Sequence, residues 1–158
     1  MMKMKLTLTA LAICLGSVSI SSSQEEGEDN LATLLKSTGW DVLIGTWLNP
    51  SGEEFIFSWQ YPGAALEMAA EVDGVKRASI YVKRAKSNKV NVFAYDSGGS
   101  SSFGTCTFSK GIAEFVMNTN VPGTSEIQEM KFKYTLTGVD AFEATMEGHD
   151  HVYKYTRK

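Results

Sequence analysis

The segment Leu43-Ile44-Gly45-Thr46-Trp47 marks the place where the pattern of this sequence changes. Before it, three leucines between Leu31 and Leu35 have helical spacing, with Asn30 as a candidate N-cap and Gly39 as a C-terminal stop. After Gly39, apolar residues alternate with polar ones, which is the period of a β-strand. The sequence therefore predicts a short helix at 31–38, followed by β structure to the C-terminus.

The region after Gly39 divides into short alternating segments separated by turn sequences, of which Asp73-Gly74 is the strongest hairpin signal. The expected strands are 41–48, 53–60, 65–72, 75–85, 89–95, 102–108, 111–118, 128–137, 141–147 and 151–157. Each strand has one apolar face, and short loops join consecutive strands. A β-sandwich usually needs Greek-key crossovers. We therefore predict an all-β fold, an up-and-down antiparallel β-barrel of 8–10 strands with a short N-terminal helix.

The N-terminus has the pattern of a signal peptide. Lys3 and Lys5 precede an apolar run from Leu6 to Ile20, and small polar residues follow it. The run is shorter than the roughly 20 apolar residues of a membrane-spanning helix. The expected organisation is a signal peptide at 1–23, an acidic flexible segment at 24–30 and a barrel domain at 31–158. The mature protein is then secreted or periplasmic and has no transmembrane segment. Lipoprotein anchoring through Cys14 is not expected, because Ile13 occupies a position that normally carries a small residue.

Charge and cysteine content limit the possible partners. The chain has a formal net charge of −3, and removal of Lys3 and Lys5 with the signal peptide lowers it by two more units. No basic cluster with interleaved aromatic residues is present, so nucleic-acid binding is not expected. Cys106 is the single cysteine of the mature chain. We expect a buried thiol in a monomer, with an intermolecular disulfide as the alternative.

Gly45-Thr46-Trp47 on the first strand after a short helix, followed by a meander, resembles the start of a lipocalin-like (calycin) β-barrel, and most of all small secreted bacterial proteins of this build. The resemblance implies a container for a ligand. It also implies that a basic residue near the C-terminus, here Arg157, lies across the indole of Trp47. Gly45, Trp47 and Arg157 would then form the barrel floor, with Gly45 admitting close approach of the helix at 31–38. The chain departs from the family in lacking an internal disulfide and in turning directly after Leu48.

The interior of such a barrel would be apolar and aromatic. The expected ligand-lining residues are Phe55, Phe57, Trp59, Met68, Phe93, Tyr95, Phe132, Tyr134, Phe142 and Met146. These side chains can fill a small barrel, or they can line a cavity for a small molecule. We predict a non-enzymatic binding protein that holds a small apolar or amphipathic ligand. A structural or interaction protein with a filled barrel is the alternative.

The two histidines, His149 and His151, lie in one segment next to Gly148 and Asp150. A zinc site needs three or four converging ligands, whereas this segment has the composition of a turn, so no metal site is expected. Haem-binding barrels of the nitrobindin type carry an axial histidine near the C-terminus, and His151 is similar in position. Their glycine-rich pattern after the tryptophan is missing, so no cofactor is expected and haem remains an alternative. No catalytic motif is present, so no catalytic residue is predicted, and whether the protein is an enzyme stays open.

Overall fold

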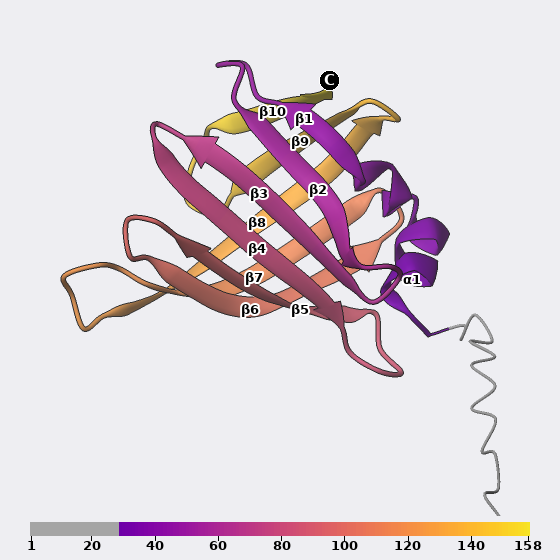
Figure 1. Ribbon diagram of the computed structural model, residues 1–158, viewed down its shortest axis with the longest axis horizontal. Coiled ribbons are helices and arrows are strands. Elements are labelled where there is room, and N and C mark those ends of the chain that lie inside the picture. The colour runs from indigo at the N-terminus through magenta and orange to yellow at the C-terminus, as the bar shows by residue number, and fades with distance from the viewer. Residues whose placement is uncertain (1–28) are drawn as a thin grey trace, which may run out of the picture.

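The computed structural model describes residues 29–158 and shows a closed antiparallel barrel of ten strands (Figure 1). Strand order follows chain order, and the first strand pairs with the last. The helices are α1 (Leu31–Thr38) and the 3₁₀ helix η1 (Trp40–Leu43). The strands are β1 (Gly45–Leu48), β2 (Glu54–Tyr61), β3 (Ala65–Val72), β4 (Val75–Lys83), β5 (Lys89–Asp96), β6 (Ser101–Ser109), β7 (Ile112–Asn120), β8 (Ile127–Gly138), β9 (Ala141–Met146) and β10 (Val152–Arg157). The predicted fold class is confirmed.

The predicted signal peptide at 1–23 and its Cys14 lie outside the described residues. Asp29, at the end of the acidic segment 24–30, forms an ion pair with Lys83 and accepts a hydrogen bond from the backbone N–H of Lys86. Between residues 29 and 158, no helix has the length and apolarity needed to cross a bilayer.

The expected strand at 41–48 is too long at its start. Residues Trp40–Leu43 form η1, and β1 begins at Gly45. Gly39 has the left-handed conformation (φ +80°) that ends α1, and the chain turns there toward the barrel. Trp40 and Leu43 are both buried, at 0% and 2% exposure. A spacing of three places both on one side of a 3₁₀ helix, whereas a strand would direct them to opposite faces.

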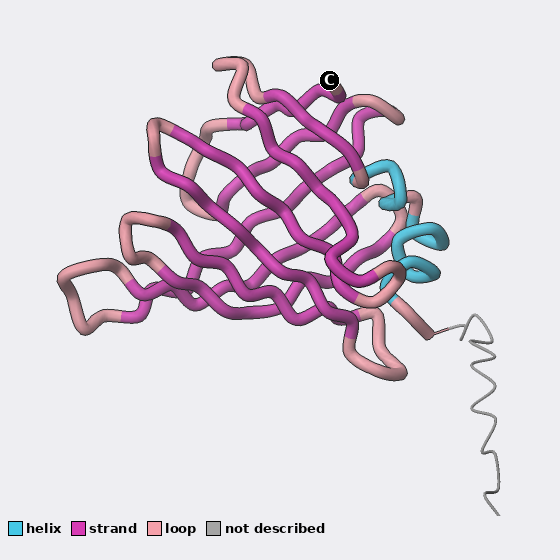
Figure 2. Tube along the Cα trace, in the orientation of Figure 1, coloured by secondary structure: helices cyan, strands magenta, loops and turns pink. Residues whose placement is uncertain are grey.

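Helix α1 covers one end of the barrel (Figure 2). Leu31 and Leu35 are each 1% exposed and pack into the same core as the strands. Two turns at this end hold the helix through the backbone: Ala32 N–H donates to Gly63 O at 3.2 Å, and Gly111 N–H donates to Thr38 O at 3.1 Å. The helix is too short to be stable alone. Its packing therefore both stabilises it and closes this end.

The core beneath α1 is filled with aromatic side chains. The ring of Phe142 makes edge contacts with Trp40 and Trp47 at centroid distances of 6.4 and 4.9 Å. Phe108 contacts Trp40 at 5.9 Å in the same geometry. All four side chains are at most 2% exposed. The half of the barrel next to the helices is thus solid.

Candidate functional site

Trp47 and Arg157 meet at the closed end, on neighbouring strands β1 and β10. The Arg157 guanidinium carbon lies 4.8 Å from the Trp47 ring centroid, within cation–π range. The guanidinium also donates to Ile44 O at 3.1 Å and to Val42 O, and it pairs with Asp140 at 3.2 Å. The predicted stacking is confirmed, and the arginine also satisfies carbonyl groups at the end of η1.

Gly45 has a different role from the predicted one. It has φ +134°, a conformation that side chains rarely adopt, and an added Cβ would lie 2.6 Å from Arg157 Nη1. The two atoms within 4 Å of that position both belong to Arg157, and none belongs to α1. The expectation that Gly45 admits the helix is therefore wrong. The residue admits the guanidinium, because arginine crosses directly over the backbone of the glycine.

A cavity of about 720 Å³ occupies the other half of the barrel. Its mouth is at the end opposite α1, beside the β1–β2 turn (Asn49, Pro50, Ser51) and Asp73 of the β3–β4 turn. The apolar part of the wall consists of Phe55, Met68, Val72, Val92, Ala94, Phe115, Met117, Phe132, Ala144, Met146 and Val152. Phe115 and Phe132 stack at 4.5 Å and form its aromatic inner part. The volume is within the range of roughly 300–1,000 Å³ typical of small-molecule sites.

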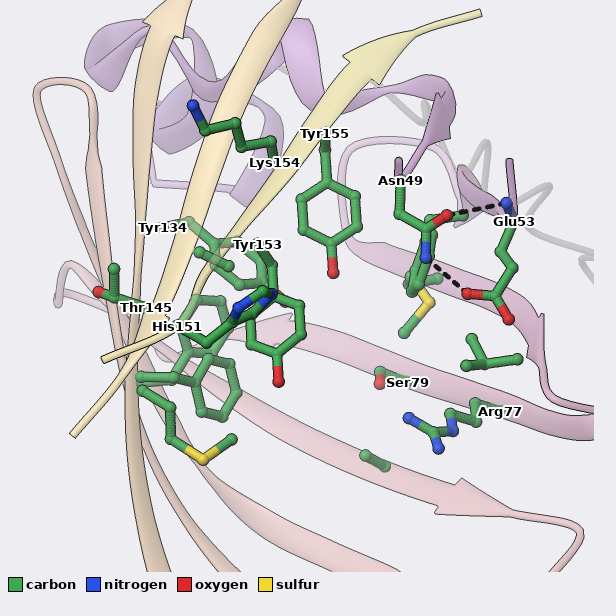
Figure 3. A pocket seen from close by; sticks show the side chains of 18 of the residues that line it. Asn49, Glu53, Arg77, Ser79, Tyr134, Thr145, His151, Tyr153, Lys154 and Tyr155 are labelled. Carbon is green, nitrogen blue, oxygen red and sulfur yellow. Dashed lines mark hydrogen bonds between the residues drawn. The ribbon is translucent and has the colours of Figure 1, made fainter. Parts of the chain in front are cut away.

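Several polar groups interrupt this wall (Figure 3). Arg77 and Ser79 come from β4, and Tyr134 and Tyr155 come from β8 and β10. Burial is the main cause that raises the pKa of the Tyr134 and Tyr155 hydroxyls. The tyrosines are therefore neutral groups near pH 7, able to donate or accept one hydrogen bond. The cavity is thus apolar with a few placed polar groups, as in sites for amphipathic molecules.

Glu53 fixes the shape of the mouth. One carboxylate oxygen accepts from Asn49 Nδ2 at 2.5 Å, and Asn49 Oδ1 accepts from Glu53 N–H at 2.9 Å. The other carboxylate oxygen accepts from Asp73 N–H at 3.1 Å. These bonds, two of which are drawn in Figure 3, join the β1–β2 and β3–β4 turns. The carboxylate therefore holds the rim and is already hydrogen-bonded through both oxygens.

The predicted lining residues fall into three groups. Five line the cavity: Phe55, Met68, Phe132, Tyr134 and Met146. Phe57 and Phe142 face inward but are buried in the core, at 3% and 2% exposure, and Trp59 packs against that core without lining the cavity.

The third group, Phe93 and Tyr95, was placed on the wrong face. They are 53% and 54% exposed on the outside of β5, and Val92 and Ala94 line the cavity from that strand. Aromatic bulk suggested the inner face, because β5 is apolar on both faces in its second half. The polar residues Lys89 and Asn91 share the face of Phe93, and that signal identifies the outer side.

Arg77, Ser79, Phe115 and Met117 also line the cavity without having been predicted. Alternation on β7 could have identified Phe115 and Met117, which share the inner face of that strand with Ala113. No comparable signal exists for Arg77. An arginine in an alternating strand normally indicates the solvated face, whereas Arg77 faces inward at a mouth that solvent reaches.

The two histidines differ in position. His151 lies in the cavity wall, and its ring contacts that of Tyr153 at 4.4 Å. His149 belongs to the β9–β10 turn, where its N–H donates to Met146 O at 3.1 Å, and it does not line the cavity. Within residues 29–158, no three His, Cys, Asp or Glu side chains are grouped so as to hold a metal ion.

Cys106 faces the core from β6 and is fully buried. Burial, followed by the charge of Glu114, raises the pKa of its thiol well above the usual range. The group is therefore a neutral core thiol, as predicted, and takes no part in the cavity.

Comparisons with known proteins support the architecture. No family model matches this chain, and no curated protein matches it significantly. Among solved structures, the chain is similar to Rv2717c from M. tuberculosis, with a TM-score of 0.53 and 13% sequence identity over 82% of this chain and 99% of that one. At so low an identity the likeness shows a similar fold and nothing more.

Proposed function

We propose that this protein binds a small apolar or amphipathic molecule in its barrel cavity and carries out no reaction on it. The observation that carries the proposal is the cavity of about 720 Å³, enclosed by strands, with a mostly apolar wall and a braced mouth. Because the opposite end is closed by α1 and filled with aromatic rings, a ligand would enter and leave at one end only. The lipocalin-like resemblance of Gly45-Thr46-Trp47 is consistent with such a container.

Two alanine-to-tryptophan variants test the proposal. Ala94→Trp adds an indole inside the cavity, whereas Ala69→Trp adds the same bulk on the exposed face of β3. Organic extracts of the purified proteins would be analysed by mass spectrometry, and binding of dodecanol would be measured by calorimetry. We expect a co-purifying molecule or dodecanol binding in the wild type and in Ala69→Trp, and neither in Ala94→Trp. Absence of both in folded wild-type protein would refute the container function.

Secretion is part of the same proposal, on the strength of the N-terminal pattern of Lys3, Lys5 and the apolar run up to Ile20. N-terminal sequencing of protein made in a secreting host is expected to begin near residue 24. An intact Met1 on the exported or retained protein would contradict it.

A haem-binding function is a second candidate, supported by the position of His151 in the cavity wall. Titration with haemin would then give a Soret band that is lost in His151→Ala and kept in His149→Ala. No band in the wild type, or equal bands in both variants, would exclude axial ligation by His151.

An interaction function remains a third candidate because of the exposed aromatic residues Phe93 and Phe103. They are cross-strand neighbours on β5 and β6, at 53% and 52% exposure. Sedimentation across a range of concentrations tests whether this face joins two copies. If the protein acts only as a ligand container, it should sediment as a monomer at every concentration.

A further inference from the structure

Arg77 is a cation on the inside of a mostly apolar cavity. It lies on β4 with its side chain on the same face as Ser79 and Tyr81, which are 6% and 3% exposed. None of the side-chain hydrogen bonds or ion pairs between residues 29 and 158 involves it. A guanidinium carries five donors in a planar fork and usually binds carboxylate or phosphate where it meets apolar surroundings.

The acidic side chains near Arg77 are bound elsewhere. Asp96 is its cross-strand partner on β5, but Asp96 Oδ1 accepts from Gly98 N–H at 2.9 Å and Ser100 N–H at 3.0 Å, within its own turn. Glu53 is bound by Asn49 and by the backbone of Asp73. The charge of Arg77 adds to the Ser100 and Gly98 hydrogen bonds in lowering the pKa of Asp96, but no hydrogen bond or ion pair joins the two side chains in the described part of the chain. The donors of Arg77 therefore remain available to a ligand.

The polar groups next to Arg77 face the same space. In Figure 3 the guanidinium, the Ser79 hydroxyl and the Tyr155 hydroxyl point into one part of the cavity. Burial, followed by the charges of Tyr153 and Glu53, raises the pKa of Tyr155, and the positive charge of Arg77 acts in the opposite direction. Lys154 also borders the cavity, but its Nζ forms an ion pair at 3.7 Å with Glu143, a residue of β9. Arg77 is thus the cation directed inward.

We propose that Arg77, with the hydroxyl groups of Ser79 and Tyr155, binds the carboxylate head group of a single-chain amphipathic ligand. The apolar chain then lies along Phe115, Phe132 and Met117, deeper in the barrel. This inference rests on the proposed function and specifies its ligand class. It places the charged end near the mouth, where solvent reaches Arg77, and the apolar end against the stacked rings.

The test compares three probes of equal chain length: dodecanoate, dodecanol and dodecyltrimethylammonium, each below its micelle-forming concentration. Calorimetric titrations would use the wild type, Arg77→Gln and Arg84→Gln. Arg84 follows β4 at the opposite end of the barrel and is exposed, so its replacement makes the same change in net charge away from the cavity.

We expect dodecanoate to bind the wild type and Arg84→Gln more tightly than the cationic probe does. Arg77→Gln should weaken dodecanoate binding about tenfold, or about 1.4 kcal/mol, with little effect on dodecanol. Equal dodecanoate binding by the wild type and Arg77→Gln would overturn the head-group assignment and leave the container intact. Failure of all three probes to bind wild-type protein would overturn the container itself.

Discussion

At the scale of single residues, Gly45 shows how one backbone conformation supports the closed end. Its φ of +134° and its contact with Arg157 leave no room for a side chain. Gly45→Ala is expected to destabilise the protein by about 1–3 kcal/mol, because it combines backbone strain with displacement of the guanidinium. Gly138→Ala is the matched control, since an added Cβ there meets nothing within 4 Å and φ is not positive. Denaturant unfolding measures both. Equal losses would contradict the role assigned to Gly45.

Cys106 gives a second prediction at this scale, on pH dependence. Its folded-state pKa is raised, so its contribution to stability is complete below the unfolded-state pKa and is lost as pH rises. The unfolded chain ionises the thiol above about pH 8.5, which lowers the unfolding free energy by up to about 1.4 kcal/mol per pH unit. The free energy of unfolding, measured between about pH 8 and 10, should therefore fall more steeply with pH in the wild type than in Cys106→Ala. Parallel curves would show that the folded protein ionises this thiol as easily as the unfolded chain.

At the scale of elements, β5 tests which face of a strand is inside. Val90 is fully buried, whereas Phe93 is 53% exposed. Val90→Thr is expected to cost about 1–3 kcal/mol, because it places a hydroxyl in the core. Phe93→Thr, which places a threonine on the outer face of the same strand, should change stability by less than about 0.5 kcal/mol. Chemical unfolding of both variants is the measurement, and a larger loss for Phe93→Thr would mean that the register of β5 is shifted by one residue.

The same strand shows how far the sequence predicts this structure. On β8, Phe132 and Tyr134 alternate with Lys131 and Lys133, so both the strand and its inner face could be predicted. On β5 the sequence predicts the strand but not its inner face, since apolar residues occupy both sides. The apolar period identifies the inner face only where the outer face is polar. Phe93 is a hydrophobic residue on the outer face, so the period fails there.

The candidate site was less predictable than the fold for a related reason. Its apolar wall follows from alternation, and five of the ten expected residues line the cavity. Arg77 does not follow, because a wet cavity mouth tolerates a guanidinium that a packed core would exclude. Likewise, the 3₁₀ helix at Trp40–Leu43 depends on the direction that the chain takes after the left-handed turn at Gly39, and that direction is set by tertiary packing.

At the scale of the whole molecule, the barrel has one short seam. Strands β1 and β10 pair through two residues each, Trp47 with Arg157 and Leu48 with Thr156, whereas β6 and β7 pair along nine. The bond from Lys158 N–H to Thr46 O, at 2.9 Å, extends the seam by one step. The contacts of Arg157 with Trp47, Ile44 O and Asp140 lie at this point. Closure of the barrel therefore depends on a few interactions, most of them made by one arginine.

Local opening is expected to begin at this seam, because exchange rates follow the local stability of each pair of strands. Hydrogen exchange followed by mass spectrometry should show faster exchange for peptides covering β1 and β10 than for those covering β6 and β7. Arg157→Gln should accelerate the first set, since it leaves the Ile44 and Val42 carbonyls without their donors, and should affect the second set only through global stability. Lys154→Gln is the matched control. It removes one positive charge from the same strand, β10, but breaks only an exposed ion pair with Glu143, so it should leave both sets nearly unchanged. If all peptides instead exchanged at one rate in Arg157→Gln, the barrel would open as a single cooperative unit, and closure would depend on the whole sheet.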